Sequence, residues 1–188
     1  MNYSDDLKIV WWGIGACGSG TMSDFLRDYY NLVDNGRNTS GIPEDKKDYT
    51  VVTNVRNPYA WELSTYFDVS EGNDTTFEEF LEKGGYCTQQ PLIADYYIRC
   101  EDMYSEIQKV PNIKFGPLFQ SEAKERLSNP TYQRSRPFIT KTMLRDYWNQ
   151  ELVDKYSERY AELFKVTGYN KDSWKTGIHW EGFDELRL

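Results

Sequence analysis

The sequence predicts an α/β protein in which a central, mostly parallel sheet is flanked by helices. Two short runs, Ile9–Trp12 and Tyr49–Val55, read as strands, and each is followed by a segment with apolar residues at helical spacing. Strands that alternate with helices are typical of parallel sheets, whose ligands bind at the carboxyl ends of the strands. The 188 residues suffice for a buried core, and we expect a single domain with its core at about 8–169 and a tail at 170–188.

The first strand and the first helix are joined by a turn that is rich in glycine, at positions 13, 15, 18 and 20. Such a turn aims several backbone N–H groups and the positive end of the helix dipole at one point, which suits a phosphate or a sulfate. The spacing fits the dinucleotide fingerprint G-x-G-x-x-G and also the outer glycines of a Walker A loop, but Ser19 and Thr21 stand where that loop needs a lysine. The alternative is a tight turn without a ligand.

The second strand ends in Arg56-Asn57-Pro58, which predicts the start of another helix, because Asn57 is a favourable N-cap and Pro58 suits the first turn. An arginine at a strand end can bind a phosphate through two parallel hydrogen bonds. Ser64 lies two helical turns further along and can face the same side as the helix start. The alternative is that Arg56 pairs with a surface carboxylate and Ser64 only packs.

In the middle of the chain, the sequence predicts shorter helices and strands. A polar loop is expected over Asn35–Asp48, and Thr76–Glu79 forms a capping box that opens a short helix. Tyr96–Arg99 reads as a buried strand, and Met103–Val110 reads as a helix. Pro111–Pro130 is interrupted by prolines and leaves room for one short helix.

One long helix is predicted near the C-terminus, over Leu144–Thr167, with Gly168 as its natural end. Its apolar stripe consists of Trp148, Leu152, Tyr156, Tyr160, Leu163 and Phe164.

Composition excludes several classes of protein. The net charge of −8 and the lack of a basic run argue against broad nucleic-acid binding, so an anion has to be held by a local cluster of cations and backbone donors. The 3 cysteines and the single histidine, His179, lack the spacing of a metal site or a disulfide scaffold. No stretch approaches the roughly 20 apolar residues of a membrane span, and the N-terminus lacks the regions of a signal peptide, which predicts a cytoplasmic protein. The oligomeric state stays open.

Four segments, in order along the chain, resemble the sulfotransferases that use 3′-phosphoadenosine 5′-phosphosulfate (PAPS). Cys17–Thr21 resembles the 5′-phosphosulfate loop, usually P-K-[ST]-G-[TS]-[TS], and Val55–Pro58 with Ser64 resembles the 3′-phosphate site, V-R-[DN]-P-x5-S. Tyr97–Met103 is similar to a strand end of the family, and Glu151–Tyr169 is similar to the closing helix of its carbohydrate-type members.

The resemblance implies a P-loop-like three-layer fold and transfer of a sulfuryl group from PAPS to a hydroxyl of a carbohydrate or another small acceptor, with PAP as the second product and no metal. Arg134–Lys141 is a basic stretch that resembles the family's late segment over the cofactor. The residues implied to bind the cofactor are Cys17, Gly18, Ser19, Gly20, Thr21, Met22, Arg56, Ser64, Arg136 and Lys141. Ser19 is also an implied catalytic residue. The implied general base lies after the first helix, where we choose Glu44 over Asp34 and Asp45.

The chain departs from the family at Gly18, where a lysine or arginine usually neutralises charge on the departing phosphate. Three explanations are open. A cation from elsewhere (Lys141, Arg134, Arg136 or Lys8) replaces it, the amides with Ser19 and Thr21 suffice for a slow enzyme, or the domain binds PAP without catalysis.

Two other classes of nucleotide-binding protein are rivals. An NADP-dependent oxidoreductase needs an acidic residue at the end of the second strand, about 20 residues after the glycines, whereas this strand ends in Arg56, 38 positions after Gly18. A P-loop kinase needs the missing lysine.

Overall fold

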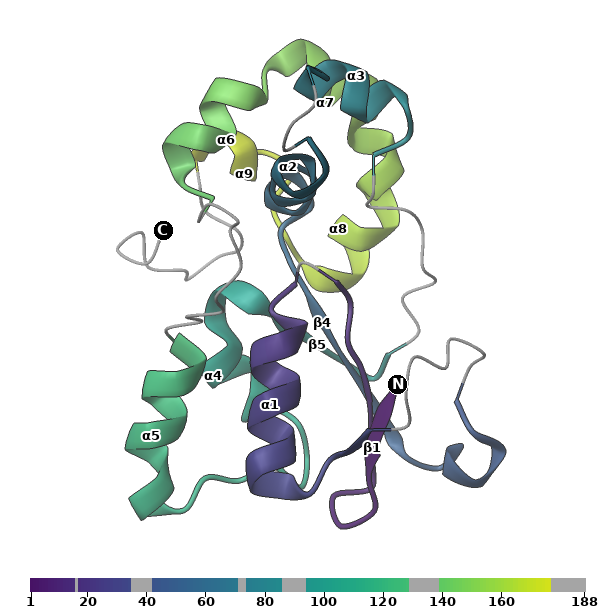
Figure 1. The fold of residues 1–188 in the computed structure, drawn as a ribbon, viewed down its shortest axis with the longest axis vertical. Coiled ribbons are helices and arrows are strands. Elements are labelled where there is room, and N and C mark those ends of the chain that lie inside the picture. Colours follow the sequence, from purple (N-terminus) through teal and green to yellow (C-terminus); the bar gives the residue numbers. More distant parts are fainter. Residues whose placement is uncertain (16, 35–41, 71–73, 86–93, 129–138, 177–188) are drawn as a thin grey trace. The chain divides into compact units, whose positions relative to one another are not determined.

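The computed structural model describes residues 1–15, 17–34, 42–70, 74–85, 94–128 and 139–176, which form an α/β structure. The chain divides into two compact units, each made of two separate chain segments, where the sequence predicts a single domain (Figure 1). The sheet unit comprises Met1–Val55 and Ile93–Gln133, and the helical unit comprises Arg56–Leu92 and Arg134–Leu188.

The sheet unit contains a five-stranded sheet with the order β3-β1-β2-β4-β5. Its strands are β1 (Asn2–Ser4), β2 (Ile9–Trp12), β3 (Val33–Asp34), β4 (Thr50–Val55) and β5 (Tyr96–Arg99). β2, β4 and β5 are the three predicted strands, and they run parallel, whereas β1 pairs antiparallel with both β2 and β3. The sheet is therefore mixed rather than mostly parallel. β1 and β3 span three and two residues, too few for a periodic pattern to reveal them.

The α-helices of the sheet unit pack on one face of the sheet. They are α1 (Ser19–Tyr30), α4 (Met103–Ile107) and α5 (Pro117–Ser128). Ile9 and Trp11 of β2, Val52 of β4 and Ile98 of β5 alternate onto this face and join Phe25 of α1 in one buried cluster. In the described part of this unit the sheet and these helices make two layers, so the three-layer arrangement is not confirmed. Two 3₁₀ turns, η1 (Glu44–Lys46) and η2 (Cys100–Asp102), complete the unit.

The helical unit surrounds an aromatic core. Its elements are α2 (Pro58–Val69), α3 (Phe77–Glu82), α6 (Lys141–Tyr147), α7 (Gln150–Tyr156), η3 (Ser157–Tyr160), α8 (Ala161–Thr167) and α9 (Ser173–Thr176). Tyr59 at the start of α2 is fully buried, and its ring lies 4.8 Å from that of Trp148 and 5.5 Å from that of Phe164, centroid to centroid. The indole Nε1 of Trp148 donates to the Tyr59 carbonyl at 3.1 Å, so the polar N–H group of this buried ring has a hydrogen-bond partner inside the core.

The predicted helix ends are confirmed. The Asn57 side chain accepts hydrogen bonds from the backbone N–H groups of Tyr59 and Ala60 at 3.0 and 3.2 Å, with Pro58 in the first turn. Thr76 and Glu79 form both bonds of a capping box. Gly168 ends α8 with a φ of 71°, the left-handed conformation that favours glycine.

The long helix predicted over Leu144–Thr167 is wrong as a single element. Trp148 leaves the helical region, with φ −98° and ψ 134°, and Asn149 starts a new helix by accepting from the Leu152 N–H at 2.9 Å. The turn η3 then separates α7 from α8. All six stripe residues are buried nonetheless, because successive short helices can present the same residues to one core. Within Pro111–Pro130 the structure forms a longer helix than the short one predicted, because α5 has 12 residues.

Candidate functional site

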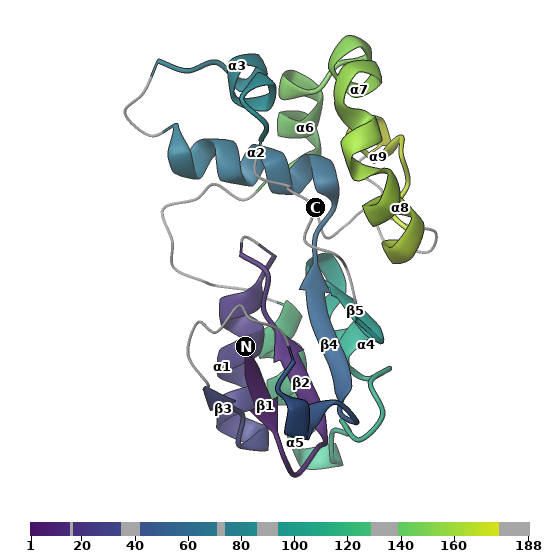
Figure 2. The ribbon, with the colours of Figure 1, turned by 90° about the vertical axis from the view of Figure 1, so that its right-hand side faces the viewer.

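The glycine-rich turn lies at the carboxyl end of β2, as predicted. β2 ends at Trp12 and α1 begins at Ser19, so the loop of residues 13–18 connects the two (Figure 2). β4 and β5 run parallel to β2, and the edge where all three strands end also carries the turn η2. The structure thus contains the strand, loop and helix that an anion site of this type requires.

A buried asparagine of β4 holds this loop. Asn54 has no exposed surface, and its Oδ1 accepts from the Ile14 N–H at 3.2 Å while its Nδ2 donates to the Cys17 carbonyl. One side-chain amide therefore joins both arms of the loop. Sequence analysis did not single out Asn54, although an asparagine inside the β-branched run Tyr49–Val55 is the signal that could have revealed it.

Gly18, the last residue of the loop, adopts a left-handed conformation with φ 74° and ψ 15° and makes no side-chain cap for α1. A Cβ built on Gly18 would lie 3.2 Å from the Met103 Sδ and 3.4 Å from the Cys100 Cβ. A side chain at this position would therefore start against η2 and α4. The left-handed φ favours glycine at position 18, and a longer side chain there would begin in close contact with Met103.

The start of α1 offers mainly backbone donors. The first N–H groups of a helix have no intrahelical partner, and they carry its positive partial charge. Ser19 is half-buried and is the first residue of α1. Thr21 is 7% exposed, and its buried Oγ1 has no hydrogen-bond partner among the described residues, which is unusual for a hydroxyl. Cys17 and Met22 are fully buried, so any contribution from these two residues to a site comes from their backbone.

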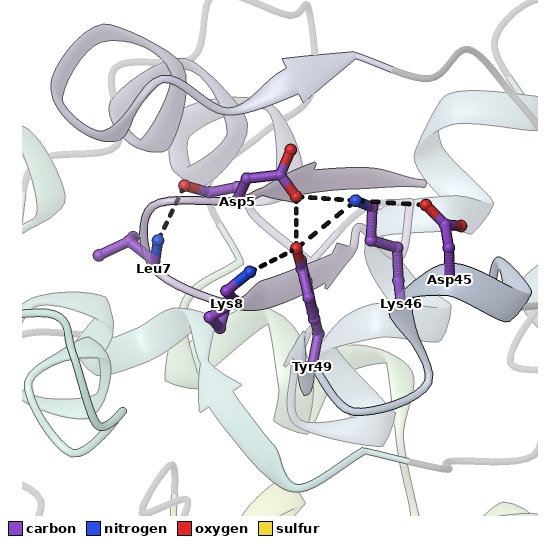
Figure 3. A network of polar contacts seen from close by, with 7 residues as sticks. Asp5, Leu7, Lys8, Asp45, Lys46 and Tyr49 are labelled. Atoms are coloured by element: carbon purple, nitrogen blue, oxygen red, sulfur yellow. Dashed lines mark hydrogen bonds and ion pairs between the residues drawn. The ribbon is translucent and has the colours of Figure 1, made fainter.

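The structure does not place Glu44 at the edge of the sheet where β2, β4 and β5 end. Glu44 is the first residue of η1 and lies six positions before Thr50, where β4 begins, and its exposed carboxylate pairs with Lys47 at 2.5 Å. η1 contacts the opposite edge of the sheet, where β2 and β4 begin. There Lys46 Nζ lies 2.8 Å from Asp5 Oδ1, in the turn between β1 and β2 (Figure 3). The choice of Glu44 as general base is therefore not supported by its position.

Lys8 also lies at that opposite edge. It precedes β2, and its Nζ donates to the Tyr49 hydroxyl at 3.1 Å, just before β4 begins (Figure 3). Lys8 is thus separated from the loop by the full length of β2 and is not the replacement for the missing loop cation.

Asp34 is the one alternative base whose backbone lies near the loop edge. In β3 it pairs with Asn2 of β1, and Asn2 pairs in turn with Trp11, next to the end of β2. β3 is two strands away from β2 in the sheet, so its backbone lies about 10 Å from that of β2. Asp45, the third carboxylate considered, belongs to η1 and pairs with Lys46 at 3.3 Å.

The residues predicted to bind the 3′-phosphate belong to the helical unit. Arg56 follows β4 directly and is half-exposed, and Ser64 lies in α2 with 2% of its surface exposed. Lys141 is the first residue of α6 and is half-exposed. Arg134, Ser135 and Arg136 lie outside the described residues, as does His179.

Compared with known proteins, the chain matches no family model, no curated protein and no solved structure. Among the helices of the described residues, none combines the length and the apolar character needed to cross a bilayer. Functional inference therefore rests on the residues of this chain. The N–H groups at the start of α1 suit an anion, whereas Gly18 does not supply a cation beside them.

Proposed function

We propose that this protein binds PAPS and transfers its sulfuryl group to a hydroxyl of a carbohydrate or another small acceptor. The observation that carries the proposal is the loop between β2 and α1, which Asn54 holds and which leaves the N-terminus of α1 without a side-chain cap. An uncapped helix start after a parallel strand is a ready anion site. The proposal includes a P-loop-like three-layer fold.

The roles of the residues follow from the resemblance and from their positions. The N–H groups of Ser19, Gly20 and Thr21 and the Ser19 hydroxyl bind the 5′ end of the nucleotide, and Arg56 binds the 3′-phosphate. Bound PAPS supplies an activated sulfuryl group. Ser64 is nearly inaccessible in this structure, so its proposed contribution is weaker than that of Arg56.

The general base of the proposal is Asp34 rather than Glu44. Its backbone lies at the edge where β2 ends, and a carboxylate there can accept the proton of an acceptor hydroxyl. Asp34→Asn is expected to reduce sulfate transfer by at least tenfold while PAP affinity stays within twofold. Full transfer by this variant would remove Asp34 from the role.

One observation favours a second function, a PAP-binding module without catalysis. Position 18, where the family usually has a cation, is a left-handed glycine whose Cβ direction points toward Met103. A transferase would then have to neutralise charge on the departing phosphate through the amides, the helix dipole and other basic side chains, such as Arg56 or Lys141. Stabilisation of that charge is worth several kcal/mol in enzymes of this type, roughly a hundredfold or more in rate.

Two measurements test the proposal in sequence. The first measures the melting temperature with PAP, NADP, ATP or ADP present, and only PAP is expected to raise it. Stabilisation by NADP but not by PAP would instead select the oxidoreductase alternative. Transfer of labelled sulfate from PAPS to a panel of sugars and small alcohols then separates the transferase from the binding module.

A further inference from the structure

Asn54 is an unusual residue for its position. It is the penultimate residue of β4, its partner in register on β5 is Ile98, and it shares a face of the sheet with Val52. All three residues are at most 1% exposed. A buried amide is costly unless its donor and its acceptor are both satisfied, and an apolar residue here would have extended the core.

The Asn54 amide binds the loop through both its oxygen and its nitrogen. It accepts from one loop residue, Ile14, and donates to another, Cys17, as a neighbouring peptide group would. Ile14 and Cys17 turn their side chains inward, with 8% and 0% exposure, whereas Gly15 between them is exposed, and a Cβ added to it would meet nothing within 4 Å. The bridge thus fixes the inner side of the loop and leaves the glycine backbone between its two contacts facing outward.

We propose that Asn54 is the positioning residue of the anion site, which sets the conformation of the loop before the ligand arrives. This inference rests on the proposed function, because it assigns Asn54 to the binding of the 5′ end of PAP. Preorganised donors bind more tightly since the loop does not have to be ordered during binding. Asn54 itself does not touch the ligand and acts through its contacts with the backbone of Ile14 and of Cys17.

The test replaces Asn54 with an aspartate of nearly the same shape. Asn54→Asp keeps the acceptor for the Ile14 N–H but, when ionised, has no donor for the Cys17 carbonyl. At pH 8, calorimetry is expected to show PAP affinity at least tenfold below that of the wild type. Burial raises the pKa of a carboxyl, and a protonated aspartate regains the missing donor. The ratio of the variant's affinity to that of the wild type should therefore recover toward one as the pH falls to 5.

Two further variants separate positioning from stability. Thr53→Val removes a buried bond of the same strand, from the Thr53 Oγ1 to the Trp12 carbonyl at 2.6 Å, without touching the loop, and should leave PAP affinity within twofold. Asn54→Leu removes both loop contacts without introducing a charge. It should weaken PAP at least tenfold at every pH and is decisive if Asn54→Asp does not fold at pH 8.

The outcomes distinguish the two proposals. If the wild type binds PAP and both Asn54 variants bind it within twofold of the wild type, Asn54 has only a structural role and the inference is wrong. An affinity ratio for Asn54→Asp that stays low and constant from pH 8 to pH 5 also contradicts it. If the wild type does not bind PAP at all, the proposed function fails, and the role of Asn54 in it fails as well.

Discussion

At the scale of single residues, the backbone conformation of Gly18 determines the direction in which a side chain at position 18 would start. Its left-handed φ of 74° turns the Cβ direction toward the Met103 Sδ, 3.2 Å away. A lysine at this position would begin in close contact with Met103 and would have to shift that side chain before its ammonium group could reach a ligand. The positive charge that a sulfotransferase needs has to come from residues distant in the sequence.

Gly18→Ala should lower the free energy of unfolding by about 1–2 kcal/mol, the cost of a left-handed conformation for a residue with a Cβ. Gly15→Ala is the matched control, because a Cβ there meets nothing within 4 Å and no left-handed φ is required. Urea unfolding of the two variants measures the difference. Equal stabilities would mean that the loop relaxes freely around position 18.

At the scale of elements, the break between α6 and α7 shows where sequence periodicity stops being informative. The stripe from Trp148 to Phe164 is compatible with one straight helix, yet Trp148 is extended and its indole binds the Tyr59 carbonyl. This tertiary contact, together with the N-cap of Asn149, overrides a continuous helical pattern.

Asn149→Ala should therefore destabilise the protein by about 1 kcal/mol, the usual cost of losing an N-cap. Gln150→Ala, the exposed next residue, removes only a contact with Asp154 within the helix and should cost a few tenths of a kcal/mol. Thermal unfolding of both variants checks the order. If Asn149→Ala were no more destabilising than Gln150→Ala, the cap would not determine where α7 begins.

The polar cluster at the amino ends of β2 and β4 makes stability depend on pH. Hydrogen bonds from Lys46, and then from Tyr49, lower the pKa of Asp5 below its usual value of 3.8 (Figure 3). A carboxyl with a lowered folded-state pKa stabilises the protein above its unfolded pKa, and this contribution is lost as the pH falls through the folded pKa.

The melting temperature of the wild type should therefore fall more steeply below about pH 4 than that of Asp5→Asn, which cannot titrate. Hydrogen bonding to Tyr49 and to Asp5 raises the pKa of Lys8 and Lys46 respectively, so their contributions persist to higher pH than usual. Melting curves between about pH 2.5 and about pH 7 measure the effect. Parallel profiles for the two proteins would show that Asp5 contributes nothing through its charge.

The sequence predicts the local features of this fold better than its long-range ones. Strands β2, β4 and β5, the Asn57 cap and the capping box at Thr76–Glu79 depend on neighbouring residues and were all predictable. The strand pairings that place Glu44 at one edge and Asp34 at the other involve residues far apart in sequence, and so does the bridge from Asn54 to the loop. No local pattern contains that information.

At the scale of the whole molecule, the 3′-phosphate of PAP is the group that we assign to Arg56, the residue that follows β4. Arg56→Ala should weaken PAP by about 2 kcal/mol, roughly thirtyfold, because a charge-assisted bond to the 3′-phosphate is lost. Adenosine 5′-phosphate, which lacks that phosphate, is the matched ligand, and its affinity should not change. An equal loss for both ligands, or none for PAP, would separate Arg56 from the 3′-phosphate.

The chain enters the helical unit after Val55, returns to the sheet unit near Ile93, and leaves it again after Gln133. Neither unit is therefore encoded by one uninterrupted stretch of sequence. A fragment that stopped at Gln133 would contain every strand of the sheet, but it would strip Tyr59 of its neighbours Trp148 and Phe164. Dissection of this protein by simple truncation is for that reason expected to yield insoluble pieces, and isolating either half requires joining its two segments with a new linker.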